Sequence, residues 1–121
     1  MNYMLLIYDD EKLWGSMSES ERGQVFAEYG AYTQELRDKG AYVDGDALQP
    51  TSTATSVRVR DGEQLVTDGP FTETKEQLGG YYIVDVETLD EALEWAAKIP
   101  SARLGTIEVR PVMSVGAEAQ A

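Results

Sequence analysis

The sequence predicts an α+β fold in which helices cover one face of an antiparallel sheet. Three observations predict it: short apolar runs typical of strands, two stretches with helical spacing that each begin with a capping box, and a hairpin signal between them. The chain has 121 residues and a mass of 13.4 kDa, the usual size of one domain. Its 42% hydrophobic and 26% charged residues are the composition of a globular protein.

The first part of the chain reads as a strand followed by a helix. Residues 3–8 are apolar and aromatic and too few for an independent helix, which predicts a buried strand that ends at residues 9–10. Ser18 and Glu21 form a capping box, and the helix that begins there is expected to end at Gly40. Its core face carries apolar and aromatic residues at helical spacing: Val25, Tyr29, Tyr32 and Leu36.

The middle of the chain contains a hairpin signal. Residues 42–48 predict a short strand or extended loop. Residues 55–60 alternate between valine and arginine, so we expect a half-exposed strand whose valines face inward. The Asp-Gly pair at residues 61–62 is a two-residue hairpin signal before the strand at 64–67.

The last part repeats the order of strand and capped helix. Residues 81–86 form an apolar run typical of a strand. Thr88 and Glu91 have the form of a second capping box, and Pro100 is expected to end the helix that follows. A final strand is predicted from residues 105–112.

This order of elements is that of a ferredoxin-like α+β domain. We expect a single domain over residues 1–112 and a frayed tail over residues 113–121, which lacks apolar periodicity. A sheet with one bare apolar face exposes more hydrophobic surface than a soluble monomer usually tolerates. A homodimer packed sheet to sheet is therefore predicted.

Composition excludes several classes of function. Ten Lys and Arg against 22 Asp and Glu give a formal charge of −12, which repels phosphate backbones and anionic lipids; we expect neither nucleic acid nor membrane as partner. No cysteine and no histidine are present, so thiolate chemistry and the commonest transition-metal ligands are missing. We expect no metal, no cofactor and a cytoplasmic protein, because the apolar start reaches acidic residues too soon for a signal peptide.

Four blocks of residues carry a resemblance to a known family. The blocks are Asp68-Gly69-Pro70-Phe71, Lys75-Glu76-Gln77-Leu78-Gly79-Gly80-Tyr81-Tyr82, Glu91-Ala92 with Trp95-Ala96-Ala97, and Glu108-Val109-Arg110-Pro111. On these blocks the chain resembles the DGPF proteins of the YCII-related family, from its first strand to Pro111.

The resemblance implies a bacterial, soluble, dimeric ferredoxin-like α/β barrel, in a family often encoded beside extracytoplasmic-function sigma factors. It implies no established reaction. Some members of the wider family place a histidine and an aspartate together in a cleft. This chain has no histidine, and alignment on the end of the first helix puts Tyr29 at that position, so a His–Asp pair is impossible here.

Asp68 is the first candidate for a catalytic residue, because a strand end beside a cleft can hold a carboxylate on a rigid scaffold. The alternative is structural: Asp-Gly is a turn dipeptide, and an Asp side chain can bond backbone amides two residues further on. Turn chemistry does not explain Phe71, which is a candidate for substrate contact or a core residue.

Charged residues follow the motif closely. Glu73, Lys75 and Glu76 could split their pKa values so that one carboxylate acts as acid and another as base. The same cluster could be a solvated surface turn. Lys75 and Glu76 are therefore candidates for substrate binding.

Arg22 lies at the margin of the core face of the first helix, beside Tyr29. Its side chain either extends into solvent or points into a cavity. In the second case Arg22 and the Tyr29 hydroxyl would suit an anionic or carbonyl-bearing small molecule.

Together these residues predict a pocket between sheet and helices for an unidentified small molecule, with Asp68 at its mouth. If the protein is an enzyme, Asp68 would transfer a proton, Tyr29 would hydrogen-bond the substrate, and Arg22 or Lys75 would stabilise negative charge. The alternatives are an accessory protein that partners a sigma factor, and a protein that acts only through its dimer surface because side chains fill the pocket.

Overall fold

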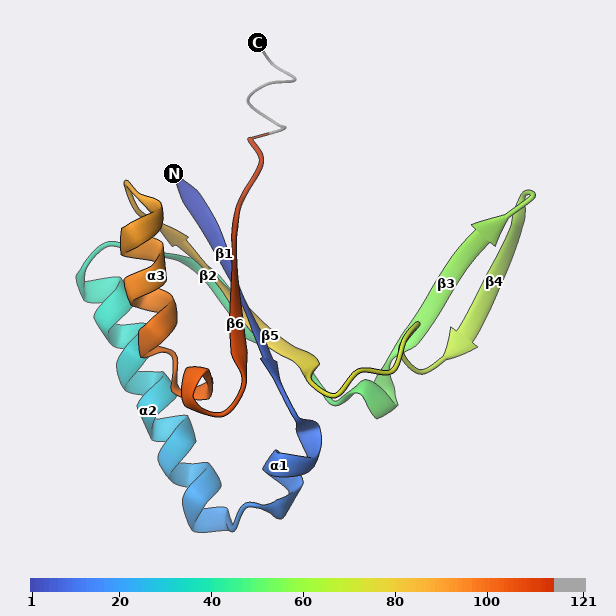
Figure 1. Ribbon diagram of the computed structural model, residues 1–121, viewed down its shortest axis with the longest axis horizontal. Coiled ribbons are helices and arrows are strands. Elements are labelled where there is room, and N and C mark those ends of the chain that lie inside the picture. Colours follow the sequence, from blue (N-terminus) through green and yellow to red (C-terminus); the bar gives the residue numbers. More distant parts are fainter. Residues whose placement is uncertain (115–121) are drawn as a thin grey trace.

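The structure is a computed structural model that describes residues 1–114, and it contains a four-stranded antiparallel sheet covered on one face by helices (Figure 1). The strands lie in the order β2-β5-β1-β6. Their bounds are β1 Asn2–Asp9, β2 Tyr42–Ala47, β5 Gln77–Asp85 and β6 Thr106–Pro111.

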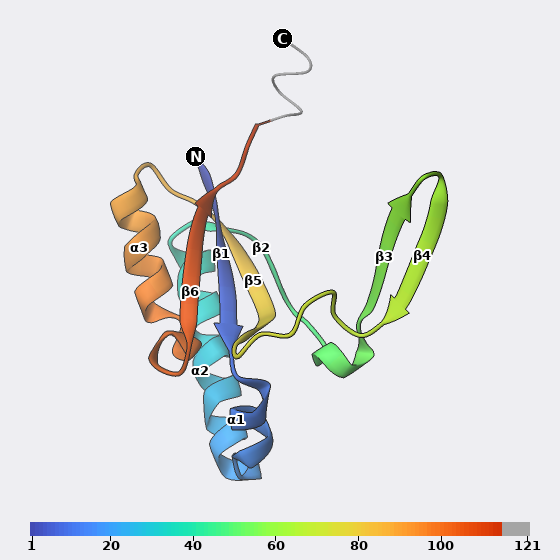
Figure 2. The ribbon, with the colours of Figure 1, turned by 45° about the vertical axis from the view of Figure 1, so that its right-hand side comes forward.

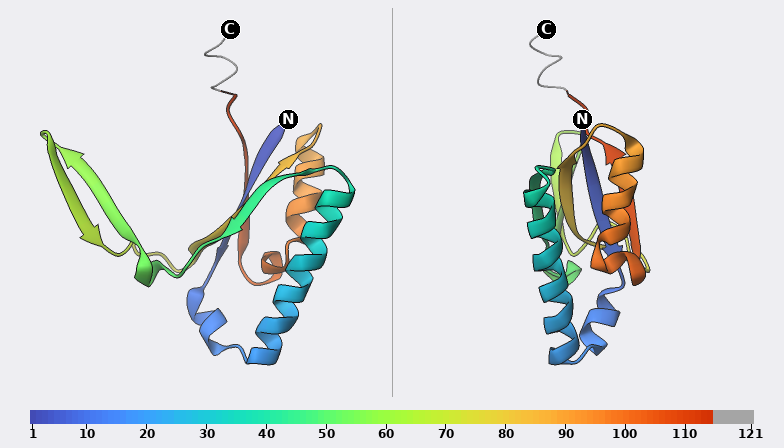
Figure 3. Two further views of the ribbon diagram at one scale, coloured as in Figure 1. Left: turned by 180° about the vertical axis from the view of Figure 1, so that it is seen from behind. Right: turned by 90° about the vertical axis from the view of Figure 1, so that its left-hand side faces the viewer.

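Two helices, α2 (Glu19–Asp38) and α3 (Leu89–Lys98), pack side by side on one face of the sheet (Figures 2 and 3). The predicted capping box is confirmed at α2, where the Ser18 hydroxyl accepts the N–H of Glu21 and the Glu21 carboxylate accepts the N–H of Ser18. The shorter elements are α1 (Glu11–Ser16) and two 3-10 turns, η1 (Thr51–Thr53) and η2 (Pro100–Arg103).

The core lies between the sheet and these helices. Successive residues of a strand point to opposite faces, and in β1 the odd-numbered residues from Tyr3 to Asp9 are buried against the helices. Side chains from β5, α2 and α3 complete the core, namely Tyr82, Val84, Val25, Tyr32, Leu36, Ala92 and Ala96. The antiparallel sheet and its two covering helices are those of the predicted ferredoxin-like α+β fold.

The predicted hairpin is confirmed as β3 (Thr55–Arg60) and β4 (Glu63–Asp68), but it is separate from the four-stranded sheet. Its turn has left-handed backbone at Asp61 (φ 51°) and Gly62 (φ 78°), as a two-residue Asp-Gly turn requires. We call residues 55–68 the arm. The arm stands on the side of the sheet opposite to α2 and α3 (Figures 1 and 3).

The prediction that the valines of β3 face inward is wrong. Val57 is 59% exposed and Val59 is 62% exposed. Alternation in a strand shows only that its two faces differ, and here neither face packs on the sheet. Because the arm pairs only with itself, its valine face remains open to solvent.

The root of the arm is nevertheless fixed to the sheet and to α1. The Leu48 N–H donates to the carbonyl of Gly79 at 2.9 Å. Both carboxylate oxygens of Glu11 accept from Thr51, from its N–H at 2.7 Å and its hydroxyl at 2.8 Å, while the Glu11 N–H donates to Gln77 Oε1 at 3.0 Å. We call this set of hydrogen bonds the root cluster.

Two further predictions concern the ends and surroundings of the domain. Residues 115–121, most of the predicted tail, lie outside the described residues. No helix within residues 1–114 is long and apolar enough to cross a membrane.

Candidate functional site

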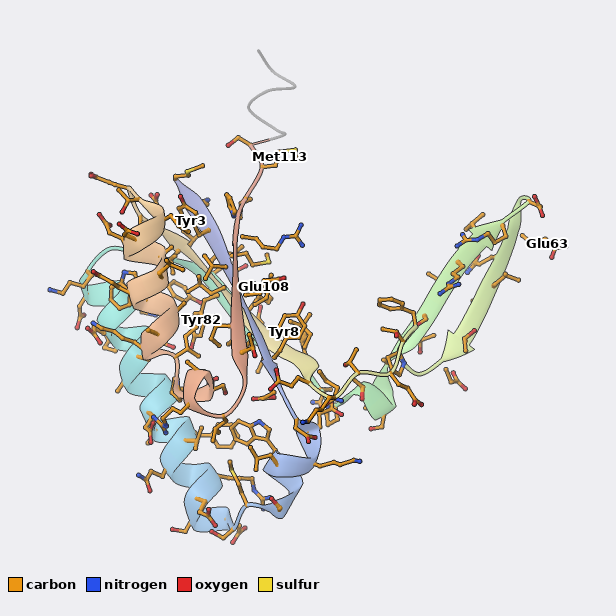
Figure 4. The ribbon with its side chains drawn as sticks, viewed as in Figure 1. Tyr3, Tyr8, Glu63, Tyr82, Glu108 and Met113 are labelled. Carbon is orange, nitrogen blue, oxygen red and sulfur yellow. The ribbon has the colours of Figure 1, made fainter. Side chains whose placement is uncertain are left out.

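A cavity of about 610 Å³ lies between α2 and the end of the sheet where β1 runs into α1. Small-molecule sites in proteins have this size. Its wall includes residues of β1, α1, α2, β2 and β5, the segment 48–50, and Ser101 of η2. Tyr82, a buried residue of β5 that is labelled in Figure 4, also lines this cavity.

Asp9 places a buried carboxylate in this cavity. It continues the inward-facing odd residues of β1 and is only 5% exposed. A β-bulge faces it, because the β1–β5 register shifts between Ile7 and Tyr8 and leaves Gly79 as the additional residue. The indole Nε1–H of Trp14, on α1, donates to Asp9 Oδ2 at 2.8 Å.

One stripe of α2 forms the opposite wall. Residues four and three positions apart share a face of a helix, and this spacing joins Arg22, Phe26, Tyr29 and Thr33, which all line the cavity. The ring of Phe26 stacks on Trp14 with 6.1 Å between centroids. The adjacent stripe of α2 carries the buried core residues, so α2 has its core face and its pocket face side by side.

Two hydroxyl pairs connect α2 to the floor of the cavity. The hydroxyls of Tyr29 and Ser101 lie 2.6 Å apart, and those of Thr33 and Tyr82 lie 2.7 Å apart. Burial raises the pKa of Tyr29, the Ser101 hydroxyl opposes the rise, and the nearby Asp9 charge adds to it. Burial likewise raises the pKa of Tyr82. Both phenols therefore stay neutral and can donate hydrogen bonds at neutral pH.

A close backbone approach at Gly105 holds the turn that carries Ser101 against the end of β1. A Cβ atom at Gly105 would collide with the carbonyl oxygen of Tyr8. The Gly105 N–H also donates to the carbonyl of Ser101 at 2.8 Å, which fixes the turn after α3. Only glycine permits this contact, so Gly105 helps to define the floor of the cavity.

The structure brings two of the predicted site residues together and leaves the others outside. Arg22 and Tyr29 line the cavity. Asp68 does not: it is exposed at the end of β4, where it pairs with Thr55 at the base of the arm. The arm projects away from the helix-covered face, so Asp68 is not at the mouth of this cavity.

The remaining predicted residues lie between the arm and β5. Phe71 is 75% exposed and is not a core residue. Lys75 is exposed, and neither residue lines the cavity. Glu76 is half-buried and its Oε1 accepts the Thr106 hydroxyl at 2.9 Å, which ties the start of β5 to β6.

Sequence reasoning missed Asp9, Trp14 and Ser101. The sequence predicts only that the strand ends at residues 9–10, although the odd number of Asp9 places it on the same face as Tyr3, Leu5 and Ile7. That parity is the signal that could have found it. Trp14 and Ser101 lie on α1 and η2, two short elements for which the sequence has no apolar periodicity.

No group of three or more carboxylates in residues 1–114 is arranged to hold a metal ion. The charged side chains that line the cavity are instead three carboxylates, Asp9, Glu11 and Asp46, and one guanidinium, Arg22, together with several hydroxyls. This set can accept a proton, donate hydrogen bonds and balance a negative charge.

Comparison with known proteins agrees with the resemblance seen in the sequence. The model of the YCII-related domain matches residues 1–115. An uncharacterised protein of Rhizobium meliloti (strain 1021) is 39% identical over 114 residues, which cover 93% of this chain and 92% of that protein.

A solved structure has the same fold at low sequence identity. It is the 5-chloro-2-hydroxyhydroquinone dehydrochlorinase of Burkholderia phenoliruptrix AC1100 in complex with 2,5-dihydroxybenzoquinone. The TM-score is 0.52 and the identity 18%, over 93% of this chain and 94% of the enzyme. From its family match and its curated relative, this chain belongs to the YCII-related family.

Proposed function

We propose that this protein binds a small hydroxylated molecule in the cavity beneath α2 and transfers a proton to and from it through Asp9. The strongest support for this proposal is that only one of the two Asp9 carboxylate oxygens has a hydrogen-bond partner among residues 1–114. Oδ2 is bonded to Trp14, whereas Oδ1 has no hydrogen-bond partner among residues 1–114. No fully buried polar side-chain atom there lacks a partner, so Oδ1 is accessible at the cavity.

Each polar group around the cavity has a role in such a reaction. Asp9 Oδ1 would accept the proton of a ligand O–H or C–H group and return it in the reverse step. The Tyr29 hydroxyl, held by Ser101, would donate a hydrogen bond to a ligand oxygen. Arg22 would balance the negative charge that remains on the ligand after proton removal.

The dehydrochlorinase of the same fold supports the choice of ligand class. That enzyme is named for a chlorinated hydroxyhydroquinone and holds a dihydroxybenzoquinone, which are flat rings that carry hydroxyl groups. The cavity here has aromatic side chains from Trp14, Phe26 and Tyr29 on its walls. Aromatic walls favour a flat ring through stacking and edge contacts.

The proposal is tested with 2,5-dihydroxybenzoquinone as the probe. Its ring C–H groups exchange with solvent deuterium only through proton transfer at carbon, which NMR follows directly. We expect the protein to accelerate this exchange, and Asp9→Asn to reduce the acceleration by roughly 10²- to 10⁴-fold. Asp68→Asn is the matched control, because that carboxylate lies outside the cavity. Equal rates for the parent protein and Asp9→Asn would remove Asp9 from the role.

Gly79 offers a second test of the accessible oxygen. A Cβ atom at Gly79 would lie 3.5 Å from Asp9 Oδ1, an ordinary contact that needs no shift of the backbone. Gly79→Ala should therefore fold normally and weaken binding of the probe in titrations followed by NMR. Gly23→Ala is the control, since no atom beyond its chain neighbours and the backbone of its own helix lies within 4 Å of the added methyl group.

The homodimer belongs to the same proposal. On the outer face of the sheet, opposite to the helices, a stripe of half-buried apolar side chains runs across β1 and β5: Met4, Leu6, Tyr8, Tyr81 and Ile83. A second copy packed on this stripe would cover it. Light scattering at micromolar concentration should give the mass of two chains, and Leu6→Lys should give one chain, with circular dichroism confirming that the variant folds.

A role as an accessory protein is the second candidate, and the arm supports it. The arm presents an apolar valine face on a chain with a net charge of −12, a combination that suits a protein partner with a basic segment, such as a sigma factor. Co-purification of a sigma factor that is lost at high salt would favour this candidate. Co-purification that survives Val57→Glu would show that the arm is not the contact surface, and absence of co-purification at low salt would contradict the candidate.

A further inference from the structure

The cavity holds two opposite charges that do not pair with each other. Arg22 is the one cationic side chain among the described residues that line it. No carboxylate oxygen of residues 1–114 lies within 4.0 Å of the Arg22 guanidinium, whereas Arg103 and Lys98 elsewhere do form such pairs. Most Lys and Arg side chains of the described residues likewise lack such a pair, so what distinguishes Arg22 is that it lines the same cavity as the buried carboxylate of Asp9.

Trp14 contacts both charged side chains, Asp9 through its indole ring and Arg22 through its backbone carbonyl. Its indole N–H donates to Asp9 Oδ2 at 2.8 Å, and its backbone carbonyl accepts from Arg22 Nη1 at 3.3 Å. The stacking of Phe26 on the indole keeps Trp14 in place. Asp9 and Arg22 are thus both attached to Trp14 while remaining separate from each other.

The other carboxylates of the cavity do not neutralise Arg22. Glu11 uses both oxygens on Thr51 in the root cluster. Asp46 accepts the Tyr81 hydroxyl at 3.4 Å and lies on β2, at the outer edge of the sheet. The guanidinium has five N–H donors and one is used by Trp14, so most of them are available to a ligand.

Aromatic rings and bare backbone form much of the cavity wall. The rings of Trp14 and Phe26 stack on each other, with 28° between their planes. On the sheet side, Gly79 and Gly80 present backbone without side chains, and a Cβ at Gly80 would lie 2.9 Å from the carbonyl oxygen of Asp46. A planar ring fits such a surface better than a branched aliphatic group.

From this arrangement we infer that the ligand is a small aromatic hydroxy acid, whose hydroxyl group donates to Asp9 Oδ1 and whose carboxylate binds the Arg22 guanidinium. The inference rests on the proposed function and adds to it an anionic group at a defined end of the ligand. A carboxylate and a guanidinium can form two parallel hydrogen bonds, the strongest polar contact available to this cavity.

The test compares 4-hydroxybenzoate with phenol and with benzoate, each of which lacks one of its two polar groups, and includes 3-hydroxybenzoate as the positional variant. Binding is measured by protein-observed NMR at concentrations up to roughly the millimolar range. We expect at least one hydroxybenzoate to bind roughly tenfold or more tightly than either phenol or benzoate, because each of these lacks one charge-assisted hydrogen bond.

Substitutions assign each group to its end of the cavity. Arg22→Gln should weaken hydroxybenzoate roughly tenfold or more and leave phenol unchanged, which also shows that the cavity is intact. Asp9→Asn should weaken phenol and hydroxybenzoate and leave benzoate unchanged. Arg103→Gln is the control for general charge, because Arg103 pairs with Glu28 outside the cavity.

The possible failures are distinguishable. Phenol that binds as tightly as both hydroxybenzoates, with no effect of Arg22→Gln, overturns the anionic end of the ligand and leaves the proposed function in place. Absence of binding by every probe, together with unchanged deuterium exchange of 2,5-dihydroxybenzoquinone, overturns both.

Discussion

The arm and the cavity beneath α2 have opposite arrangements of polar and apolar groups. The cavity holds a carboxylate that is 5% exposed and a serine that is fully buried, each with a hydrogen-bond partner. The arm instead exposes valines to solvent and keeps its acidic residues on the surface. A packed layer of helix and sheet can hold polar groups away from water, whereas a two-stranded hairpin has no second layer with which to do so.

The comparison shows where chemistry can be performed in this fold. The most recognisable motif of the sequence, Asp68 to Phe71, begins at the base of the arm and is exposed except at Gly69. The groups that the structure brings together come from ordinary strand and helix positions. A distinctive motif is therefore a guide to the family, and the buried polar groups are a guide to the site.

The largest expected difference between the two regions concerns stability. Leu36→Ala removes a fully buried side chain of α2 from the core between helices and sheet, and should lower the free energy of unfolding by roughly 2–5 kcal/mol. Val57→Ala in the arm should lower it by less than about 0.5 kcal/mol. Urea denaturation measures both. A loss from Val57→Ala as large as that from Leu36→Ala would show that the arm is covered in solution.

The next effect concerns the buried hydroxyl pair. Tyr29→Phe leaves the fully buried Ser101 hydroxyl without its partner, which should lower the free energy of unfolding by roughly 1–3 kcal/mol. Tyr81→Phe, on the outer face, should have little effect because its hydroxyl makes only a long, exposed hydrogen bond. Thermal denaturation distinguishes them, and the double variant Tyr29→Phe with Ser101→Ala should recover part of the loss.

A smaller effect is expected from the cap of α2. Ser18→Ala removes the acceptor for the Glu21 N–H and should lower the free energy of unfolding by about 1 kcal/mol. Arg22, the first residue of α2 that lines the cavity, lies one turn after Ser18, so the same variant should weaken ligand binding slightly. Ser20→Ala is the control within the same turn. Equal melting temperatures for the two variants would contradict a stabilising role for the capping box.

The smallest effect appears at alkaline pH. Burial raises the pKa of Tyr29 and Tyr82, so the unfolded chain releases these protons at lower pH than the folded chain. Their contribution to stability is thus complete below the ordinary pKa, near 10, and is lost as the pH rises through the folded pKa. The loss should stay below about 1 kcal/mol per tyrosine at about pH 10.5.

Denaturation at several alkaline pH values measures this loss. Tyr29→Phe should reduce the loss of stability at alkaline pH by the part that Tyr29 contributes. Val57→Ala should leave the decline unchanged, because the arm contains no tyrosine. A decline that is identical in all three proteins would contradict the assignment to Tyr29.

Local signals predicted the elements of this fold, because each acts over a few residues. The Asp61-Gly62 turn and the Ser18 cap are satisfied within their own segments. Whether the hairpin joins the sheet depends on the course of residues 48–54 and 69–76, which no periodicity describes. The alternation of β3 is the same for a strand in a sheet as for a free hairpin, so it could not show that Val57 stays exposed.

The candidate site was predictable on its helical side only. Arg22 and Tyr29 follow from the geometry of one helix, which the sequence gives a regular period. Asp9 is positioned by strand parity and by a bulge in another strand, 70 residues further along the chain at Gly79. Contacts between distant segments depend on the register in which two strands pair. Gly79 and Gly80 could equally form a bulge or begin a strand, so the sequence does not determine the register at this point.

The root cluster has a mechanical consequence. Residues 48–50 are at once a wall of the cavity and the first link toward the arm, and Thr51 is clamped directly behind them. We therefore expect a force on the tip of the hairpin to displace this wall. If a partner bound at the tip changes the affinity of the cavity for a ligand, the ligand changes the affinity of the protein for that partner by the same factor.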